Sequence, residues 1–157
     1  YGTSTSYGLV AENNNLVNTH TMSLTSLTPN TLYNFRVISK DAANNTASSS
    51  NMTFTTTALD TTAPTIASPA ASNIAQTTAT ISWNLTELAT GKVYYGTINP
   101  LPLNNSSLSQ TNLTMQTAHS FNLTGLVASS TYYYVIESTD AANNTATSSQ
   151  LSFVTLN

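Results

Sequence analysis

Residues 79–85 read Ala-Thr-Ile-Ser-Trp-Asn-Leu, so that an apolar side chain alternates with a polar one along the whole stretch. Side chains of a β-strand point to opposite faces in turn, and alternation with period two therefore predicts a strand with one face on a core. The same alternation recurs at 132–136 and 151–155, whereas no window has convincing helical periodicity. β-Branched and aromatic residues fill these runs, and Asn, Ser, Gly and Pro cluster between them. The sequence predicts an all-β chain.

Short strands are expected at regular spacing through the last part of the chain. The expected ranges are 65–70, 77–85, 90–96, 107–114, 118–124, 131–139 and 148–156. Seven antiparallel strands of this length in roughly ninety residues are typical of an immunoglobulin-like β-sandwich, two packed sheets joined in a Greek key.

An internal repeat organises the chain. The segment His20–Phe54 recurs as His119–Phe153, and both copies contain the sequence Asp-Ala-Ala-Asn-Asn-Thr-Ala. Tyr1-Gly2-Thr3 aligns with Tyr95-Gly96-Thr97, so the first copy has no counterpart to about 64–94. We therefore expect tandem domains: an incomplete one at 1–57 that lacks its first strands, a linker at 58–64, and a complete one at 65–157.

The incomplete first copy should expose side chains that a complete sandwich buries. Those expected on this open face are Met22, Leu24, Phe35, Val37 and Phe54. Leaving five such side chains half covered forfeits on the order of 5 kcal/mol, which rivals the stability of a small domain. The missing strands could come from upstream residues of the same polypeptide, which we favour. The alternative is a neighbouring molecule, which would link subunits head to tail into a filament.

Several segments resemble fibronectin type III domains. Residues 27–37, Leu-Thr-Pro-Asn-Thr-Leu-Tyr-Asn-Phe-Arg-Val, resemble the Leu-x-Pro-x-Thr-x-Tyr-x-Phe-x-Val signature of that family, and Trp83 sits where the family keeps a core tryptophan. The phrases at 60–64 and 93–97 look like the tandem fibronectin type III-like repeats of prokaryotic surface and secreted proteins, related to the module that precedes purple acid phosphatases. The resemblance implies fibronectin type III sandwiches in tandem. It also implies tyrosine corners at Tyr33 and Tyr132, with each hydroxyl bonded back to the backbone.

Composition narrows the range of partners. Only 6% of residues are charged, the net charge is −3, and three basic residues are too few to follow a phosphate backbone, so nucleic acid is not an expected partner. The chain has no cysteine for a disulfide or a thiolate metal site, and no apolar run long enough for direct membrane insertion. Because the chain begins with Tyr rather than Met, we expect an excerpt from a longer precursor.

The residues that could act in catalysis or metal binding are expected to have structural roles instead. His20 and His119 occupy one repeat position and are expected to face the core, and Asp41 and Asp140 are expected to accept backbone hydrogen bonds in turns. The sequence has neither a nucleophile motif nor a calcium-loop pattern, so we expect no catalytic residue, no cofactor and no metal. One alternative stays open, a weak ion site formed by Asp60 with a turn carboxylate.

Two kinds of surface site are candidates. Alternation directs Tyr94 and Tyr133 outward from neighbouring strands, where they could pack across the strands, contact a protein or stack on carbohydrate. Eight Asn-x-Ser/Thr sequons are candidate glycosylation sites. They begin at Asn44, Asn51, Asn84, Asn104, Asn105, Asn112, Asn122 and Asn143.

Together these features predict a non-catalytic segment of a larger extracellular surface protein, with a structural or adhesive role. Its expected partners are neighbouring repeats of the same polypeptide or other copies of itself, and self-assembly into a filament by strand complementation is the sharper form of this hypothesis. The alternative is a spacer or carbohydrate-contacting accessory module of a secreted hydrolase, with carbohydrate as the partner.

Overall fold

The computed structural model describes residues 1–104 and 107–157. The chain forms two compact units, Tyr1–Leu59 (unit 1) and Asp60–Asn157 (unit 2). All regular secondary structure in the described residues is β-strand, which confirms the all-β prediction. No helix in this part of the chain has the length and hydropathy needed to cross a bilayer.

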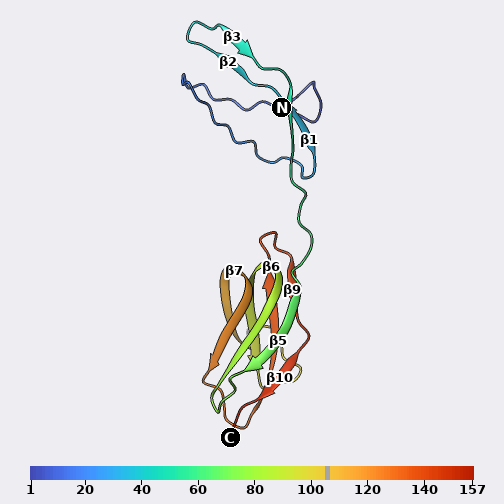
Figure 1. Ribbon diagram of the computed structural model, residues 1–157, viewed down its shortest axis with the longest axis vertical. Coiled ribbons are helices and arrows are strands. Elements are labelled where there is room, and N and C mark those ends of the chain that lie inside the picture. Colours follow the sequence, from blue (N-terminus) through green and yellow to red (C-terminus); the bar gives the residue numbers. More distant parts are fainter. Residues whose placement is uncertain (105–106) are drawn as a thin grey trace. The chain divides into compact units, whose positions relative to one another are not determined.

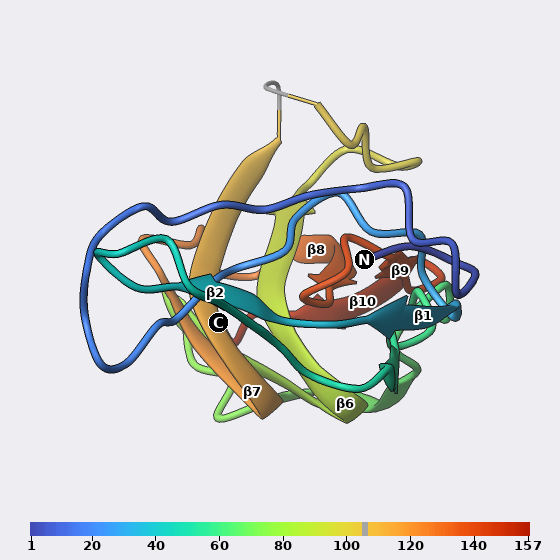
Figure 2. The same cartoon turned by 90° about the horizontal axis from the view of Figure 1, so that it is seen from above.

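The described residues of unit 2 form six strands, two of them long (Figure 1). They are β5 (Ile66–Ser72), β6 (Thr78–Gly96), β7 (Leu108–Thr124), β8 (Thr131–Thr139), β9 (Thr145–Thr147) and β10 (Leu151–Val154). β6 joins the expected strands 77–85 and 90–96, and β7 joins 107–114 and 118–124. Pairing between β6 and β7 shifts in register between Asn84 and Gly91, and both strands are strongly curved in Figure 2.

The two halves of each long strand belong to different sheets. Residues 78–84 of β6 pair with β5 on one side and with residues 118–124 of β7 on the other. Residues 91–96 of β6 pair instead with the first half of β7 and with β8, which in turn pairs with β9 and β10. All of these pairings are antiparallel. One sheet contains β5 with one half each of β6 and β7, and the other contains the remaining halves of these two strands with β8, β9 and β10. Together the two sheets form the predicted sandwich.

The last expected strand, 148–156, differs in detail. Two short strands, β9 and β10, pair with β8 in its place. The pairing begins before residue 148 and is interrupted between β9 and β10. Ser148 lies in the break, where its hydroxyl accepts a hydrogen bond from the Ile136 amide at 3.0 Å while its own amide donates to the Ile136 carbonyl. A side-chain oxygen thus replaces a backbone acceptor in the ladder, which interrupts regular pairing.

The core of unit 2 is built around Trp83, which is 2% exposed. Its ring stacks on His119 and Phe121 at centroid distances of 5.2 and 5.4 Å, and its indole N–H donates to the Ser138 hydroxyl at 3.1 Å. Ile81, Leu123, Val93 and Ile136 are fully buried as well. The expected core positions of Trp83 and His119 are confirmed.

Both tyrosine corners are present. The Tyr132 hydroxyl accepts a hydrogen bond from the Val127 amide, and the Tyr33 hydroxyl accepts one from the Thr28 amide, each at 3.1 Å. Both side chains are 5% exposed. The two units therefore fix the start of equivalent strands by the same local contact.

Unit 1 contains four short strands in two separate pairs. They are β1 (Leu32–Phe35), β2 (Ile38–Lys40), β3 (Thr46–Ser48) and β4 (Met52–Thr55), with β1 paired to β4 and β2 to β3. In the repeat, β1 and β2 together correspond to the single strand β8 of unit 2. The strand is continuous in unit 2 and divided in unit 1.

The apolar face of unit 1 is open, as the repeat predicts. Met22 and Val37 are 43% and 51% exposed, and Leu24, Phe35 and Phe54 are half-buried. His20 is exposed as well, so the expectation that it faces a core is wrong. The reason is that unit 1 has no counterpart, among its described residues, to the strand that places Trp83 against His119 in unit 2.

Candidate functional site

Three carboxylates of unit 2 converge at one point. Asp60 precedes β5, Glu87 lies in the bend of β6, and Asp140 follows β8. One oxygen from each lies within 4.8 Å of the others. The pairing of Ala89 with Asp140 holds the bend of β6 beside the turn after β8. The sequence suggested Asp60 with a turn carboxylate, but it did not suggest Glu87, because that residue falls in the part of the repeat that has only one copy.

Asp140 organises its turn by accepting local hydrogen bonds. One carboxylate oxygen accepts from the Ala142 and Asn144 amides, both at 2.8 Å, and the other accepts from the Asn144 side chain at 2.9 Å. Asp41 makes the equivalent contacts in unit 1, and Asn44 and Asn143 have φ angles of 65° and 68°. The predicted role of both aspartates in matching turns is confirmed.

These contacts perturb both carboxyl groups. Desolvation, the largest influence on Asp140, raises its pKa, but the hydrogen bonds from the Asn144 side chain and from the turn amides together lower it below the ordinary 3.8. In Asp41 the Asn45 side chain is the main cause of a lowered pKa. Both turns therefore favour the ionised carboxylate.

We expect acid to weaken unit 2 through Asp140. A carboxyl group whose pKa is lower in the folded state stabilises the fold above its ordinary pKa, and that stabilisation is lost as the pH falls through the lowered value. The thermal midpoint of unit 2 should therefore fall as the pH drops below about 4. It should fall less steeply in Asp140→Asn, which cannot titrate there. Parallel midpoint curves for the two proteins would show that this carboxyl group does not contribute.

The carboxylate cluster offers oxygen ligands of the kind that Ca²⁺ takes. Such an ion usually takes six to eight oxygens in total. Three carboxylates supply only part of such a shell, and both oxygens of Asp140 already accept hydrogen bonds. Asp60 and Glu87 are the members with more accessible side chains. The geometry is thus compatible with a partial cation shell and equally with a solvated acidic corner of the sandwich.

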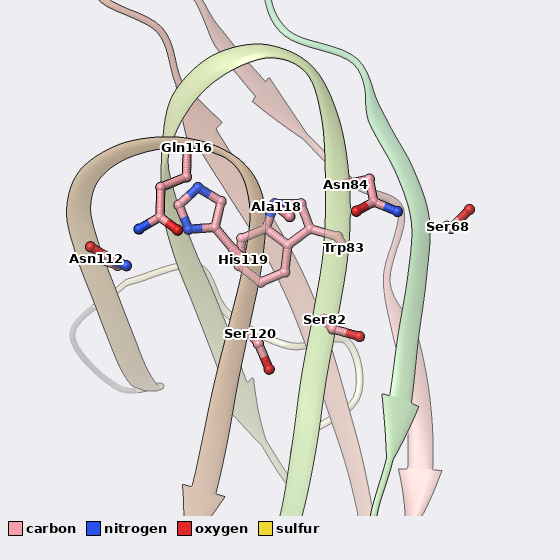
Figure 3. A pocket seen from close by; sticks show the side chains of 9 residues that line it. All are labelled: Ser68, Ser82, Trp83, Asn84, Asn112, Gln116, Ala118, His119 and Ser120. Carbon is pink, nitrogen blue, oxygen red and sulfur yellow. The ribbon is translucent and has the colours of Figure 1, made fainter.

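A polar hollow of about 420 Å³ lies beside the bend of β7 (Figure 3). It is lined by Ser68, Ser82, Trp83, Asn84, Asn112, Gln116, Ala118, His119 and Ser120. In Figure 3 the amides of Asn84 and Asn112 lie to either side of the Trp83 and His119 rings. Hydroxyl and amide groups can bind an uncharged polar molecule, but no carboxylate is among these described lining residues, and Trp83 is too buried to offer a ring face.

His119 is fixed within this wall. Its Nε2 lies 3.0 Å from the Ala89 carbonyl oxygen, and since that oxygen only accepts, Nε2 is the donor. Nδ1 is buried and has no hydrogen-bond partner among the described residues. The ring fits only because residue 91 is glycine: a Cβ there would lie 2.6 Å from the imidazole. The histidine is therefore a packed side chain between Trp83 and Gly91.

Tyr94 and Tyr133 are half-buried and lie on one face of the sheet in which β6 pairs with β8. Tyr94 of β6 is opposite Val135 of β8. The next residue pair on the same face is Gly96 with Tyr133. The Lys92 ammonium lies 4.2 Å from the centroid of the Tyr94 ring and 2.6 Å from its hydroxyl, and this hydrogen bond is the main cause of a raised pKa of Lys92. Lys92 lies two residues before Tyr94 on the same strand, and its ammonium occupies one face of the Tyr94 ring.

The sequons lie mainly on accessible surface. Seven fall in the described residues, six of them exposed and Asn112 half-buried, while Asn105 lies outside the described residues. The side-chain amide of Asn51 donates to Asn34 and its oxygen accepts from Tyr7, so a glycan at Asn51 would disturb contacts within unit 1. Glycosylation of the remaining sites stays a prediction.

Comparison with known proteins found a curated protein with a similar sequence and solved structures with a similar fold. No family model matches the chain. It is 38% identical over 141 residues to endoglucanase B of Cellulomonas fimi, an alignment that covers 87% of this chain and 13% of that protein. The chain thus spans about an eighth of the length of its curated relative. The alignment is longer than either unit, and it therefore includes residues of both.

Among solved structures, a myokine structure has a TM-score of 0.52 at 12% identity, covering 61% of this chain and all of the other. The FN1–FN3 domains of chicken CNTN1 have a TM-score of 0.48 at 14% identity, covering 84% of this chain and 45% of theirs. The antiparallel strand pairing of unit 2, its core tryptophan and its tyrosine corner are features of immunoglobulin-like β-sandwiches. Unit 2 has the fibronectin type III fold. The expected relation to the module of purple acid phosphatases is not shown by these comparisons.

Proposed function

We propose that this chain is a non-catalytic accessory segment of a larger, extracellular glucan-degrading enzyme. The observation that carries the proposal is its 38% identity to endoglucanase B over a stretch that includes both units yet is only 13% of that enzyme. A fibronectin type III sandwich with part of a second would act there as a spacer between other domains of the same polypeptide. The proposal takes up the accessory-module alternative from the sequence.

The geometry of unit 2 supports a non-catalytic role. Glycoside hydrolysis needs two carboxyl groups that face one cleft, one of them a general acid with a raised pKa. The described hollow beside β7 is lined by hydroxyl and amide groups. In the carboxylate cluster, the turn contacts of Asp140 lower its pKa, which is the opposite of what a general acid requires.

Direct contact with carbohydrate has weaker support than spacing. A sugar-stacking platform needs an open ring face. Of the two candidate tyrosines, Tyr94 has its ring covered by Lys92, which leaves Tyr133 alone. Adhesion and filament formation gain no support from the comparisons, and they stay predictions.

An exchange of segments tests the accessory role. The stretch of Cellulomonas fimi endoglucanase B that matches this chain would be deleted, or replaced by residues 1–157. We expect hydrolysis of a soluble glucan to be the same in all three enzymes, because the catalytic groups lie elsewhere. We expect hydrolysis of an insoluble glucan to fall on deletion and to be restored by this chain. Measurable hydrolysis by the isolated chain, or loss of soluble-glucan hydrolysis on exchange, would contradict the proposal.

A further inference from the structure

The hollow beside the bend of β7 lies where three strands of unit 2 are irregular. The pairing of β6 with β7 shifts in register between Asn84 and Gly91, and the pairing of β5 with β6 shifts between Ala67 and Ala70. Ser68 lies within the second shift and has a φ angle of 50°, a left-handed conformation that is uncommon for a residue other than glycine. The hollow is lined by residues of all three strands, and its volume of about 420 Å³ is typical of small-molecule sites.

The polar side chains around the hollow are uncharged and mostly unpaired. Five of them make no hydrogen bond to another described residue, namely Ser68, Ser82, Asn84, Gln116 and Ser120. The side-chain oxygen of Asn112 accepts from the Thr114 amide at 2.9 Å, and its NH₂ group has no such partner. Hydroxyl and amide side chains both donate and accept hydrogen bonds. The wall therefore complements a ligand whose own groups also do both.

An unsatisfied acceptor lies at the inner wall of the hollow. His119 is 4% exposed, and because its Nε2 donates to the Ala89 carbonyl, its Nδ1 is an acceptor that has no donor among the described residues. Nδ1 lies beside Gly91, which is paired with Asn112 of the hollow. A buried acceptor without a donor is unfavourable. A hydroxyl group that reached this end of the hollow would supply the missing donor.

We propose that this hollow binds one uncharged sugar residue of a glucan chain through hydrogen bonds, without ring stacking. Each hydroxyl of a sugar both donates and accepts, as the lining side chains do. None of the described lining residues is charged, which disfavours an ionic ligand, and the ring of Trp83 is buried. Tyr94 and Tyr133 are not part of this site. The choice of a glucan as the source of the sugar rests on the proposed function, whereas the preference for hydroxyl groups rests on the lining side chains alone.

The test titrates the unglycosylated, ¹⁵N-labelled chain with cellotetraose and follows it by NMR. We expect the side-chain NH₂ resonances of Asn84, Asn112 and Gln116 to shift and to saturate at millimolar concentrations, because a few hydrogen bonds at an open hollow bind weakly. The affinity should be the same at about 50 mM and at about 500 mM sodium chloride, since no charge takes part. Because Asn84 and Asn112 begin sequons, an oligosaccharide of N-acetylglucosamine is titrated separately and distinguishes a protein-linked glycan as the source of the sugar.

Two variants show whether the hollow is the site. The double substitution Asn84→Ala with Gln116→Ala should weaken binding of cellotetraose at least about fivefold, because it removes two groups that can bond the sugar. Neither side chain makes a hydrogen bond to another described residue, so the fold should be retained, and the thermal midpoint checks this. Asn122→Ala is the matched control. It removes an exposed asparagine of β7 that does not line the hollow, and its affinity should equal that of the wild type.

Three results would overturn the inference. They are an absence of cellotetraose shifts, an equal loss of affinity in Asn122→Ala, and binding of the N-acetylglucosamine oligosaccharide alone. The segment exchange in endoglucanase B tests the accessory role separately. Restored hydrolysis of insoluble glucan without cellotetraose shifts would contradict this inference only, whereas saturable shifts without restored hydrolysis would contradict the accessory role only.

Discussion

Replacing Trp83 with alanine is expected to lower the free energy of unfolding of unit 2 by about 3–5 kcal/mol. The substitution removes a 2%-exposed ring that stacks on His119 and Phe121, and it leaves a cavity between the two sheets. It also leaves the buried Ser138 hydroxyl without its indole donor. Since a domain of this size has a total stability of about 5–15 kcal/mol, the variant should be close to unfolding. Urea titration followed by circular dichroism measures the loss.

Trp83→Phe is the matched control for this prediction. A phenyl ring retains most of the stacking but cannot donate to Ser138, so the expected loss is smaller, about 1–3 kcal/mol. The interpretation would be wrong if the alanine and phenylalanine variants lost equal stability, because the hydrogen bond alone would then account for the effect.

The second large effect is expected at Gly91. An added methyl group would lie 2.6 Å from the His119 imidazole, which is itself held by Trp83 and by the Ala89 carbonyl. Gly91→Ala should therefore destabilise unit 2 by about 1–3 kcal/mol through overpacking. Thermal unfolding of the purified chain is a sufficient measurement.

A double-mutant cycle shows whether the clash is the cause. His119→Ala removes the ring that the new methyl group meets, so Gly91→Ala should cost much less in that background than in the wild type. Additive losses of the two substitutions would contradict the packing explanation and would indicate a backbone effect of alanine at this position.

Local signals account for most of what the sequence predicted. Alternation at 79–85 places Ile81 and Trp83 in the core, and each tyrosine corner joins residues only five apart. The turn at Asp140 is likewise built by residues up to Asn144. Because such contacts depend on few neighbouring residues, a repeated sequence reproduces them in both units.

Features that depend on distant residues were not predictable. Glu87 joins Asp60 and Asp140 only because the bend of β6 meets the turn after β8, and nothing in its local sequence indicates this. The requirement for glycine at position 91 likewise comes from His119, which is far away in the chain. The outward direction of Tyr94 was predictable from alternation, whereas the lysine that covers its ring was not.

Trp83 is the only tryptophan in the chain, and it lies in the interior of unit 2. Selective excitation of indole fluorescence will therefore respond to the melting of unit 2 alone, while the tyrosines of unit 1 remain silent in that signal. The wild-type protein carries its own optical reporter, so the unfolding of unit 2 can be followed selectively without attaching a dye.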